Sequence, residues 1–147
     1  EHHRPESHLI PLMLDAIAGK RPALTVFGTD YPTKDGTCVR DYVHVSDLVD
    51  AHVLAMEKLK AGQDGAYNVG IGNGYSVREI IDSVTRVTGK TIVVKEQPRR
   101  AGDVPRVFAD PKKIKAELGW QAKITSLDEI VATAWRWFEK HPRGYRA

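Results

Sequence analysis

The chain has 147 residues, 41% of them hydrophobic and 28% charged, and its formal net charge is +3. This length and composition predict one soluble, globular domain that buries its own core, and they exclude a disordered or collagen-like chain. The lysines and arginines are scattered along the sequence, so we do not expect nucleic acid as a partner.

The sequence has neither the run of about 18 apolar residues that a membrane span requires nor the pattern of a signal peptide. Cys38 is the only cysteine. An internal disulfide is therefore impossible, and we expect a cytoplasmic protein that does not engage a membrane.

The first elements are a helix from Ser7 or His8 to Gly19 and a strand over residues 24–28. A polar, turn-rich insertion follows at residues 29–36. Asp30 and Asp35 in this insertion could be a metal pair, but a solvated turn explains them better. We therefore expect no metal site.

The next strand, predicted over residues 39–45, has the two-residue period of a pleated strand. Valines at 39, 43 and 45 alternate with Arg40, Tyr42 and His44, so Arg40 and Tyr42 project from the same face. This polar face has two interpretations: it lies in solvent, or it contacts a ligand.

A helix capped by Ser46 or Asp47 is predicted next. The face that it is expected to bury consists of Leu48, Ala51, His52, Ala55, Met56 and Leu59. We expect His52 to be a hydrogen-bonded residue of the core or its boundary, with no chemical role. A strand over residues 66–70 follows.

Two capping boxes mark the starts of later helices. Ser76 with Glu79 opens the first, which ends at Gly89, and Ser126 with Glu129 opens the last. Between them we predict a strand over residues 91–95 and a short helix from Asp110 to Gly119.

The segment Gly70-Ile71-Gly72-Asn73-Gly74 joins a predicted strand to a helix, as a dinucleotide-binding turn does. Its spacing differs from that motif, because Tyr75 and Ser76 stand where the third glycine is required. No acidic residue ends a following strand about 20 residues later. We therefore expect no cofactor at this turn.

Residues 97–105 form a loop that contains Arg99, Arg100 and Asp103. Adjacent arginines in a loop are usually solvated. The alternative is an anion clamp, because a guanidinium matches phosphate in two-point contact and an aspartate accepts hydrogen bonds from ribose or sugar hydroxyls. Spacing alone leaves both interpretations open.

Several motifs together resemble the C-terminal, substrate-binding part of the UDP-galactose (UDP-glucose) 4-epimerases, which are extended short-chain dehydrogenase/reductases. The most specific is Arg40-Asp41-Tyr42-Val43-His44-Val45, preceded by Asp30-Tyr31-Pro32-Thr33-Lys34-Asp35-Gly36-Thr37. Further support comes from Pro98-Arg99-Arg100-Ala101-Gly102-Asp103 and Leu118-Gly119-Trp120. The resemblance covers essentially the whole chain.

This resemblance implies an α/β fold in which residues 1–147 are the C-terminal lobe of a Rossmann-type enzyme. Some of its elements would normally complete the sheet of the dinucleotide-binding half, which is missing here. We therefore expect several apolar faces to be exposed.

The implied reaction is the NAD-dependent interconversion of UDP-glucose and UDP-galactose at C4 through a 4-keto intermediate. No tyrosine in the sequence is followed four residues later by lysine, so the family's catalytic pair is absent. The chain would supply the UDP-sugar site only, NAD would bind to the missing half, and the complete protein would be a homodimer.

The resemblance also implies roles for individual residues. Arg40 and Arg100 would hold the pyrophosphate of a UDP-sugar, and Asp103 would accept from the uridine ribose. Thr25 and Phe27 would lie along the uracil. The same pocket would be lined by Leu9, Tyr42 and Val77.

Val107 falls where, by resemblance, a bulky aromatic residue narrows the sugar pocket of epimerases restricted to glucose and galactose. Its small side chain implies that UDP-GlcNAc and UDP-GalNAc are accepted as well.

Two other functions remain open from the sequence. One is a nucleotide-sugar dehydratase or decarboxylase of the same superfamily, against which the insertion at residues 30–36 argues. The other is a non-catalytic module that binds nucleotide sugars.

Overall fold

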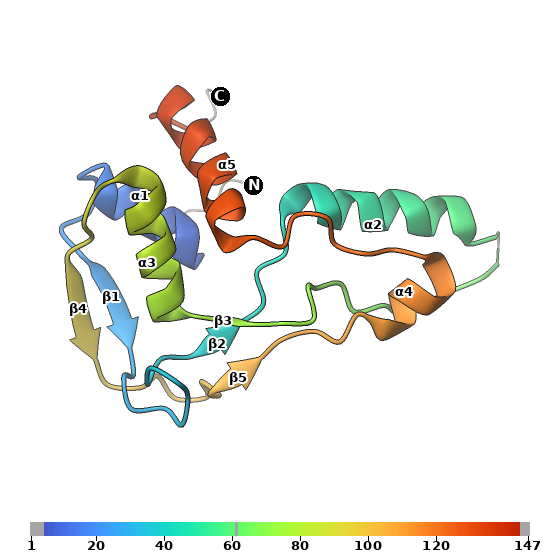
Figure 1. Ribbon diagram of the computed structural model, residues 1–147, viewed down its shortest axis with the longest axis horizontal. Helices are drawn as coiled ribbons and strands as arrows, with labels where there is room; N and C mark the ends of the chain where they lie inside the picture. The colour runs from blue at the N-terminus through green and yellow to red at the C-terminus, as the bar shows by residue number, and fades with distance from the viewer. Residues whose placement is uncertain (1–4, 61, 145–147) are drawn as a thin grey trace.

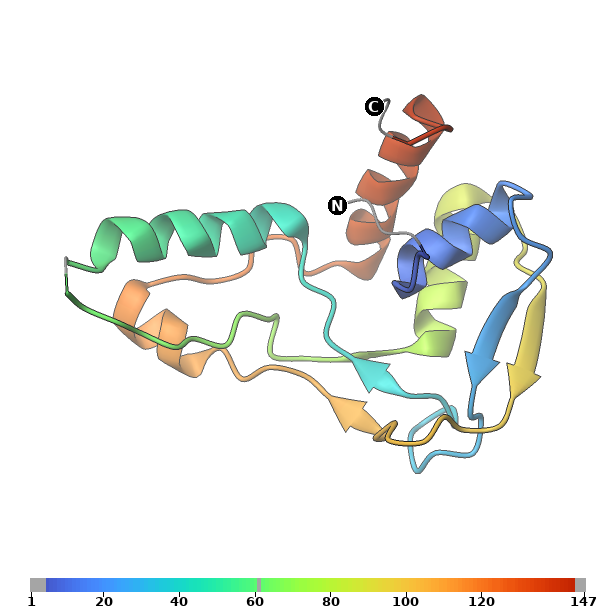
Figure 2. The same ribbon diagram turned by 180° about the vertical axis from the view of Figure 1, so that it is seen from behind.

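The structure, a computed structural model, describes residues 5–60 and 62–144. It is elongated, with helices at both ends joined by a small sheet (Figures 1 and 2). One end contains the helices α1 (Leu9–Ile17), α3 (Val77–Thr88) and α5 (Leu127–Lys140) and the strands β1 (Leu24–Phe27) and β4 (Val94–Gln97). The other contains α2 (Val45–Lys58) and α4 (Lys112–Leu118).

The small sheet between the two ends consists of β2 (Val39–Arg40), β3 (Tyr75–Ser76) and β5 (Arg106–Val107). β2 lies in its middle, antiparallel to β3 and parallel to β5. Arg40 is therefore paired with Tyr75 on one side and with Val107 on the other. The separate pair of β1 and β4 is parallel, with Phe27 opposite Gln97.

Each end has its own hydrophobic core. The larger core lies between the β1–β4 pair and helices α1, α3 and α5, and its fully buried side chains include Met13, Ile80, Val84 and Val131. The smaller core, between α2 and α4, contains Ala51, Ile114, Leu118 and Trp120. The predicted α/β class is confirmed, and the chain divides its apolar residues between two clusters.

The strand predicted over residues 39–45 is wrong beyond Arg40. Residues 41–44 belong to no strand. The His44 side chain accepts a hydrogen bond from the Ser46 backbone N–H, and α2 begins at Val45. Beyond Arg40, backbone N–H groups of the neighbouring segments, those of Ile71 and Ala109, donate to the Asp41 carboxylate and not to a strand. The cap predicted at Ser46 or Asp47 is therefore His44 instead.

The buried face of α2 also differs from the prediction. Asp47 and Ala51 are buried, whereas His52 is exposed and Met56 is 75% exposed. The helix turns the Asp47 and Ala51 face toward α4 and Trp120, so only part of the predicted stripe, Ala51 and Ala55, packs against the smaller core. The His52 ring lies 2.8 Å from the backbone oxygen of Leu48, within its own helix.

The strand predicted over residues 66–70 is absent, since Tyr67 and Val69 pack against the smaller core instead of pairing with another strand. The strand predicted over residues 91–95 forms three residues later, as β4. The capping box of Ser76 and Glu79 is confirmed. Ser126 precedes α5 but makes no side-chain cap.

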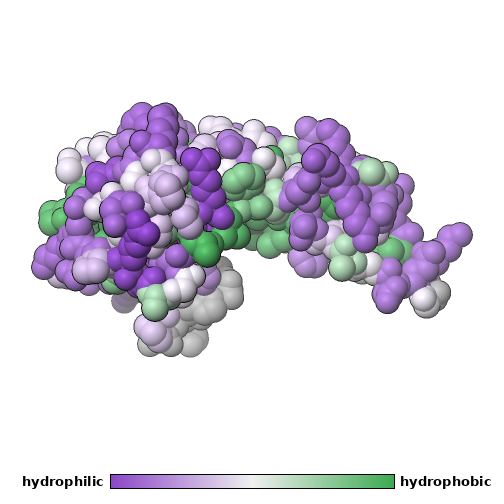
Figure 3. All heavy atoms as spheres, turned by 90° about the horizontal axis from the view of Figure 1, so that it is seen from below, coloured by the Kyte–Doolittle hydropathy of each residue, from purple (hydrophilic) through white to green (hydrophobic). Residues whose placement is uncertain are grey.

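Apolar side chains are exposed at several places. On α2 they recur at Val45, Val49, Val53 and Met56, which are between 44% and 75% exposed. Seen from below, apolar surface is visible in the middle of the molecule, between its two ends (Figure 3). Within the described residues, no helix is long and apolar enough to cross a membrane.

Candidate functional site

The carboxylate of Asp103 lies between two arginines. Its Oδ1 is 3.6 Å from Arg40 Nη2, and its Oδ2 is 3.4 Å from Arg100 Nε. These separations are longer than hydrogen bonds, so the facing N–H groups retain the capacity to donate to a ligand. The two predicted phosphate-binding residues and the predicted ribose-binding residue are thus brought together from β2 and from the loop before β5.

Arg40 is held in place by its own strand and by the loop. Its Nη1 donates to the backbone oxygens of Val39 and Val104, each at 2.9 Å. The Arg40 side chain is 30% exposed and that of Arg100 is 64% exposed. Arg40 is therefore fixed, whereas Arg100 is free to adjust to a bound group.

Phe27 lies under Arg100. The guanidinium carbon is 4.3 Å from the ring centroid, a cation–π geometry. Thr25 is half-buried on the face of β1 that also carries Phe27, because Leu24 and Val26 alternate with them and point into the larger core. Thr25 thus shares a strand face with Phe27 but is not in the group around Asp103.

Val107 is adjacent to this group, since it pairs with Arg40 between β2 and β5, and it is 52% exposed. Leu9, Tyr42 and Val77 lie elsewhere, half-buried against the larger core. Burial there raises the pKa of Tyr42 to about 12, and the charge of Arg40 opposes this rise. The predicted pocket residues therefore form two groups, one around Asp103 and one at the edge of the larger core.

The insertion before β2 is only partly a solvated turn, because Asp30 is exposed whereas Asp35 is half-buried, and the sequence analysis is corrected at Asp35. Tyr31 is 4% exposed and Thr37 is fully buried. Asp35 accepts from the backbone N–H and hydroxyl of Thr37 and from the hydroxyl of Ser76. Burial raises the pKa of Asp35, but these hydrogen bonds outweigh it and leave the pKa lowered. The Asp-x-Thr spacing of an Asx turn could have revealed this arrangement.

Asp30 contacts the arginine loop. Its carboxylate accepts from Arg99 Nε at 2.8 Å and its backbone oxygen accepts from Arg99 Nη2, while the guanidinium lies over the Tyr31 ring. The hydrogen bond from Arg99 holds the pKa of Asp30 below its ordinary value. A shallow cleft of about 350 Å³ is lined by residues 28–30 and 96–99, next to Phe27 and Arg100.

The glycine-rich turn at residues 70–74 does not fit a dinucleotide. A Cβ on Gly70 would lie 2.2 Å from Asp41 Oδ2, and one on Gly74 would lie 2.5 Å from Val39 Cγ1. These glycines allow close packing against the segment around Arg40, which leaves no cradle for a pyrophosphate. The described residues also contain no cluster of three or more metal-ligating side chains.

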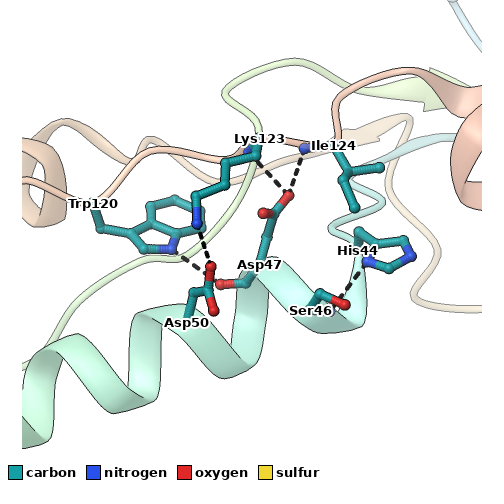
Figure 4. Close-up of polar contacts among 7 residues, drawn as sticks. All are labelled: His44, Ser46, Asp47, Asp50, Trp120, Lys123 and Ile124. Carbon is teal, nitrogen blue, oxygen red and sulfur yellow. Dashed lines mark hydrogen bonds and ion pairs between the residues drawn. The ribbon is translucent and has the colours of Figure 1, made fainter.

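Sequence reasoning missed the residue that fixes the direction of α2. The Asp47 carboxylate, 2% exposed, accepts from the backbone N–H groups of Lys123 and Ile124, and its backbone oxygen accepts from the Trp120 indole (Figure 4). His44 Nε2 lies 2.9 Å from the hydroxyl of Thr133 in α5. The start of α2 is thus hydrogen-bonded both to the segment between α4 and α5 and to α5 itself.

The model of the family described as GDP-mannose 4,6 dehydratase matches residues 2–134. The chain therefore belongs to this family. Among proteins similar in sequence is the UDP-glucose 4-epimerase of Halalkalibacterium halodurans, 48% identical over 146 residues. That match covers 99% of this chain and 44% of the relative. UDP-arabinose 4-epimerase 1 of Arabidopsis thaliana is 53% identical over 131 residues, covering 89% of this chain and 31% of the relative.

Solved structures of UDP-glucose 4-epimerases share the fold. One superposes with a TM-score of 0.94 at 48% identity, over 100% of this chain and 45% of the other. The enzyme of Bifidobacterium longum, solved with NAD⁺ and UDP, gives a TM-score of 0.88 at 38% identity, over 94% of this chain and 41% of the other. The chain is thus an α/β fragment that matches part of a UDP-glucose 4-epimerase and spans less than half of its length.

Proposed function

We propose that this chain forms the UDP-sugar-binding part of an NAD-dependent UDP-sugar 4-epimerase. The observation that carries the proposal is the group formed by Arg40, Asp103 and Arg100 beside Phe27. Its two cations and one carboxylate match the charge pattern of a nucleoside diphosphate, which has an anionic pyrophosphate next to ribose hydroxyls.

Binding of UDP to this group would exchange partners without a large rearrangement. The Arg100 guanidinium would turn from Asp103 to the pyrophosphate, and Arg40 would donate to it from Nη2 while its Nη1 keeps its backbone partners. The released carboxylate would accept hydrogen bonds from the ribose. The uracil would lie along the β1 edge at Thr25 and Phe27. Leu9, Tyr42 and Val77 would complete the pocket from the edge of the larger core.

The sugar is proposed to lie near Val107. The half-exposed Val107 side chain beside Arg40 is compatible with glucose and galactose, and the small size of this side chain supports acceptance of their N-acetyl derivatives. The similarity to UDP-arabinose 4-epimerases makes a UDP-pentose a further candidate substrate.

Hydride transfer would require an NAD site and catalytic residues, which we propose lie in the part of a complete enzyme outside this match. We propose that the exposed stripe of Val45, Val49, Val53 and Met56 on α2 lies against that part in a complete, homodimeric, cytoplasmic enzyme. The non-catalytic interpretation of the sequence predicts UDP binding as well, but no epimerisation by any longer form.

The test is calorimetric titration of the chain with UDP. Arg40→Ala and Arg100→Ala should each weaken binding by about 1.5 to 3 kcal/mol, which is about 10- to 150-fold. Arg136→Ala, at an exposed site on α5, is the control and should leave the affinity unchanged. The proposal fails if the chain does not bind UDP, or if all three variants bind it as the wild type does.

A further inference from the structure

The loop that carries Arg100 and Asp103 has little structure of its own. Residues 98–102 are exposed, and no regular element includes residues 98–105. A loop of this kind normally loses conformational entropy when it closes on a ligand, which weakens binding. Its geometry before ligand binding therefore depends on contacts made by neighbouring side chains.

Arg99 makes several of those contacts, in addition to the hydrogen bond from Arg40 to Val104 and the contact of Arg100 with Phe27. The Arg99 guanidinium is fixed at three points: Nε donates to Asp30 Oδ1, Nη2 donates to the Asp30 backbone oxygen, and Cζ lies 4.3 Å from the centroid of the Tyr31 ring. Both partners come from the insertion, which is remote in sequence from the loop. Two hydrogen bonds and a ring contact fix the direction of a planar guanidinium far better than a single ion pair does.

The insertion is rigid enough to serve as this support. Tyr31 packs directly on Gly28, where a Cβ would lie 2.4 Å from the Tyr31 ring, and Gly28 has a φ of +75° that disfavours any other residue. The Tyr31 backbone N–H donates to the backbone oxygen of Gly36 at 2.9 Å. Asp35 ties the same insertion to Ser76 at the start of α3.

We propose that Asp30 is a positioning residue for the nucleotide site. By holding Arg99, it fixes the backbone from which the adjacent Arg100 projects over Phe27 and toward Asp103. Asp30 itself would not touch UDP. This inference rests on the proposed function, because the ligand whose binding it favours is the nucleoside diphosphate.

A purely stabilising role explains the geometry less well. The Asp30 side chain is 72% exposed and that of Arg99 is 44% exposed, and exposed ion pairs add little to folding stability. Removing the pair should therefore alter ligand affinity while leaving the urea midpoint nearly unchanged. A stabilising contact would shift both.

The experiment compares Asp30→Ala with Asp50→Ala. Asp50, on α2, forms a similar exposed ion pair with Lys123, away from the arginine loop, and is the matched control. Asp30→Ala should weaken UDP binding by about threefold to tenfold, the entropic cost of ordering one or two side chains, whereas Asp50→Ala should have no effect. Hydrogen exchange of the amides in residues 99–104, measured without UDP, should accelerate in Asp30→Ala only.

Two further variants separate positioning from charge. Asp30→Asn keeps an oxygen that accepts from Arg99 Nε and should restore most of the affinity. Arg99→Lys keeps the positive charge but loses the planar, two-point contact, and should weaken binding as much as Asp30→Ala does. The double variant, Asp30→Ala with Arg99→Lys, should be no weaker than either single one.

The inference is overturned if the wild type binds UDP and Asp30→Ala binds it equally well. It is also overturned if Arg99→Lys matches the wild type, or if exchange in the loop is unchanged. A wild-type chain that does not bind UDP overturns the proposed function and this inference together, so the two failures are distinguished by the wild-type titration.

Discussion

Replacing Asp47 by alanine should destabilise the chain more than any substitution of an exposed carboxylate. Asp47 is 2% exposed, and its Oδ2 accepts from Lys123 N at 3.1 Å and from Ile124 N at 2.9 Å (Figure 4). These two hydrogen bonds fix the segment between α4 and α5 onto the first turn of α2. Alanine would remove both and leave the two N–H groups without their acceptor.

The size of the effect follows from these contacts. A hydrogen bond to a charged group contributes about 1.5 to 3 kcal/mol net. Lys123 is exposed and Ile124 is half-buried, so water can replace part of the loss, and removing a buried charge offsets some of it as well. We expect a loss of about 2 to 4 kcal/mol in the free energy of unfolding, which lowers a urea midpoint by about 1 to 2 M.

Urea unfolding followed by circular dichroism measures this loss. Asp50→Ala is the control, because Asp50 lies one turn away on α2 and pairs with the same residue, Lys123, but through an exposed side chain. It should leave the midpoint unchanged. Asp47→Asn, which keeps one acceptor oxygen, should lie between the two. Equal midpoints for Asp47→Ala and Asp50→Ala would refute the reasoning.

Three further outcomes are expected. In a complete enzyme, Val107→Tyr should lower turnover of N-acetylated UDP-sugars relative to UDP-glucose, measured as a ratio of kcat/KM values; an unaltered ratio would contradict the placement of the sugar. Gly74→Ala should cost about 1 to 3 kcal/mol of stability in thermal unfolding, because its Cβ would lie 2.5 Å from a Val39 methyl group; no change would show that β2 yields easily. Hydrogen bonds from Arg86 and Ser83 lower the pKa of Asp128. The ionised Asp128 carboxylate therefore stabilises the fold fully above the ordinary carboxyl pKa of about 4. This stabilisation is lost as the pH falls through the lowered pKa of the folded state. Asp128→Asn should flatten that acid decline in the urea midpoint, and a parallel decline would contradict the assignment.

Local signals were sufficient for most helices. The capping box at Ser76 and Glu79 and the glycines that end α3 and α4 were read correctly, because caps depend on neighbours within one turn of the chain. The resemblance also directed attention to Arg40, Arg100 and Asp103, and these three prove to be neighbours. Their roles toward UDP stay predictions.

The errors arose where distant segments decide the structure. Alternating valines predicted a strand to residue 45. The strand ends earlier, because the Asp41 carboxylate accepts hydrogen bonds from backbone N–H groups 30 and 68 residues away along the chain. Part of the face of α2 was misjudged because α4 and Trp120, which cover it, lie more than 50 residues later in the chain. Pattern within a segment cannot reveal which partner will cover it.

By itself, the sequence determined the α/β class, the starts and ends of several helices and the residue types suited to a nucleoside diphosphate. The tertiary structure alone decided that Asp103 lies between Arg40 and Arg100, that Asp30 holds Arg99, and that the carboxylate of Asp47 is buried. The reason is physical: caps and periodicity act over one or two turns of chain, whereas the directions of charged side chains are set by contacts between segments that only folding brings together.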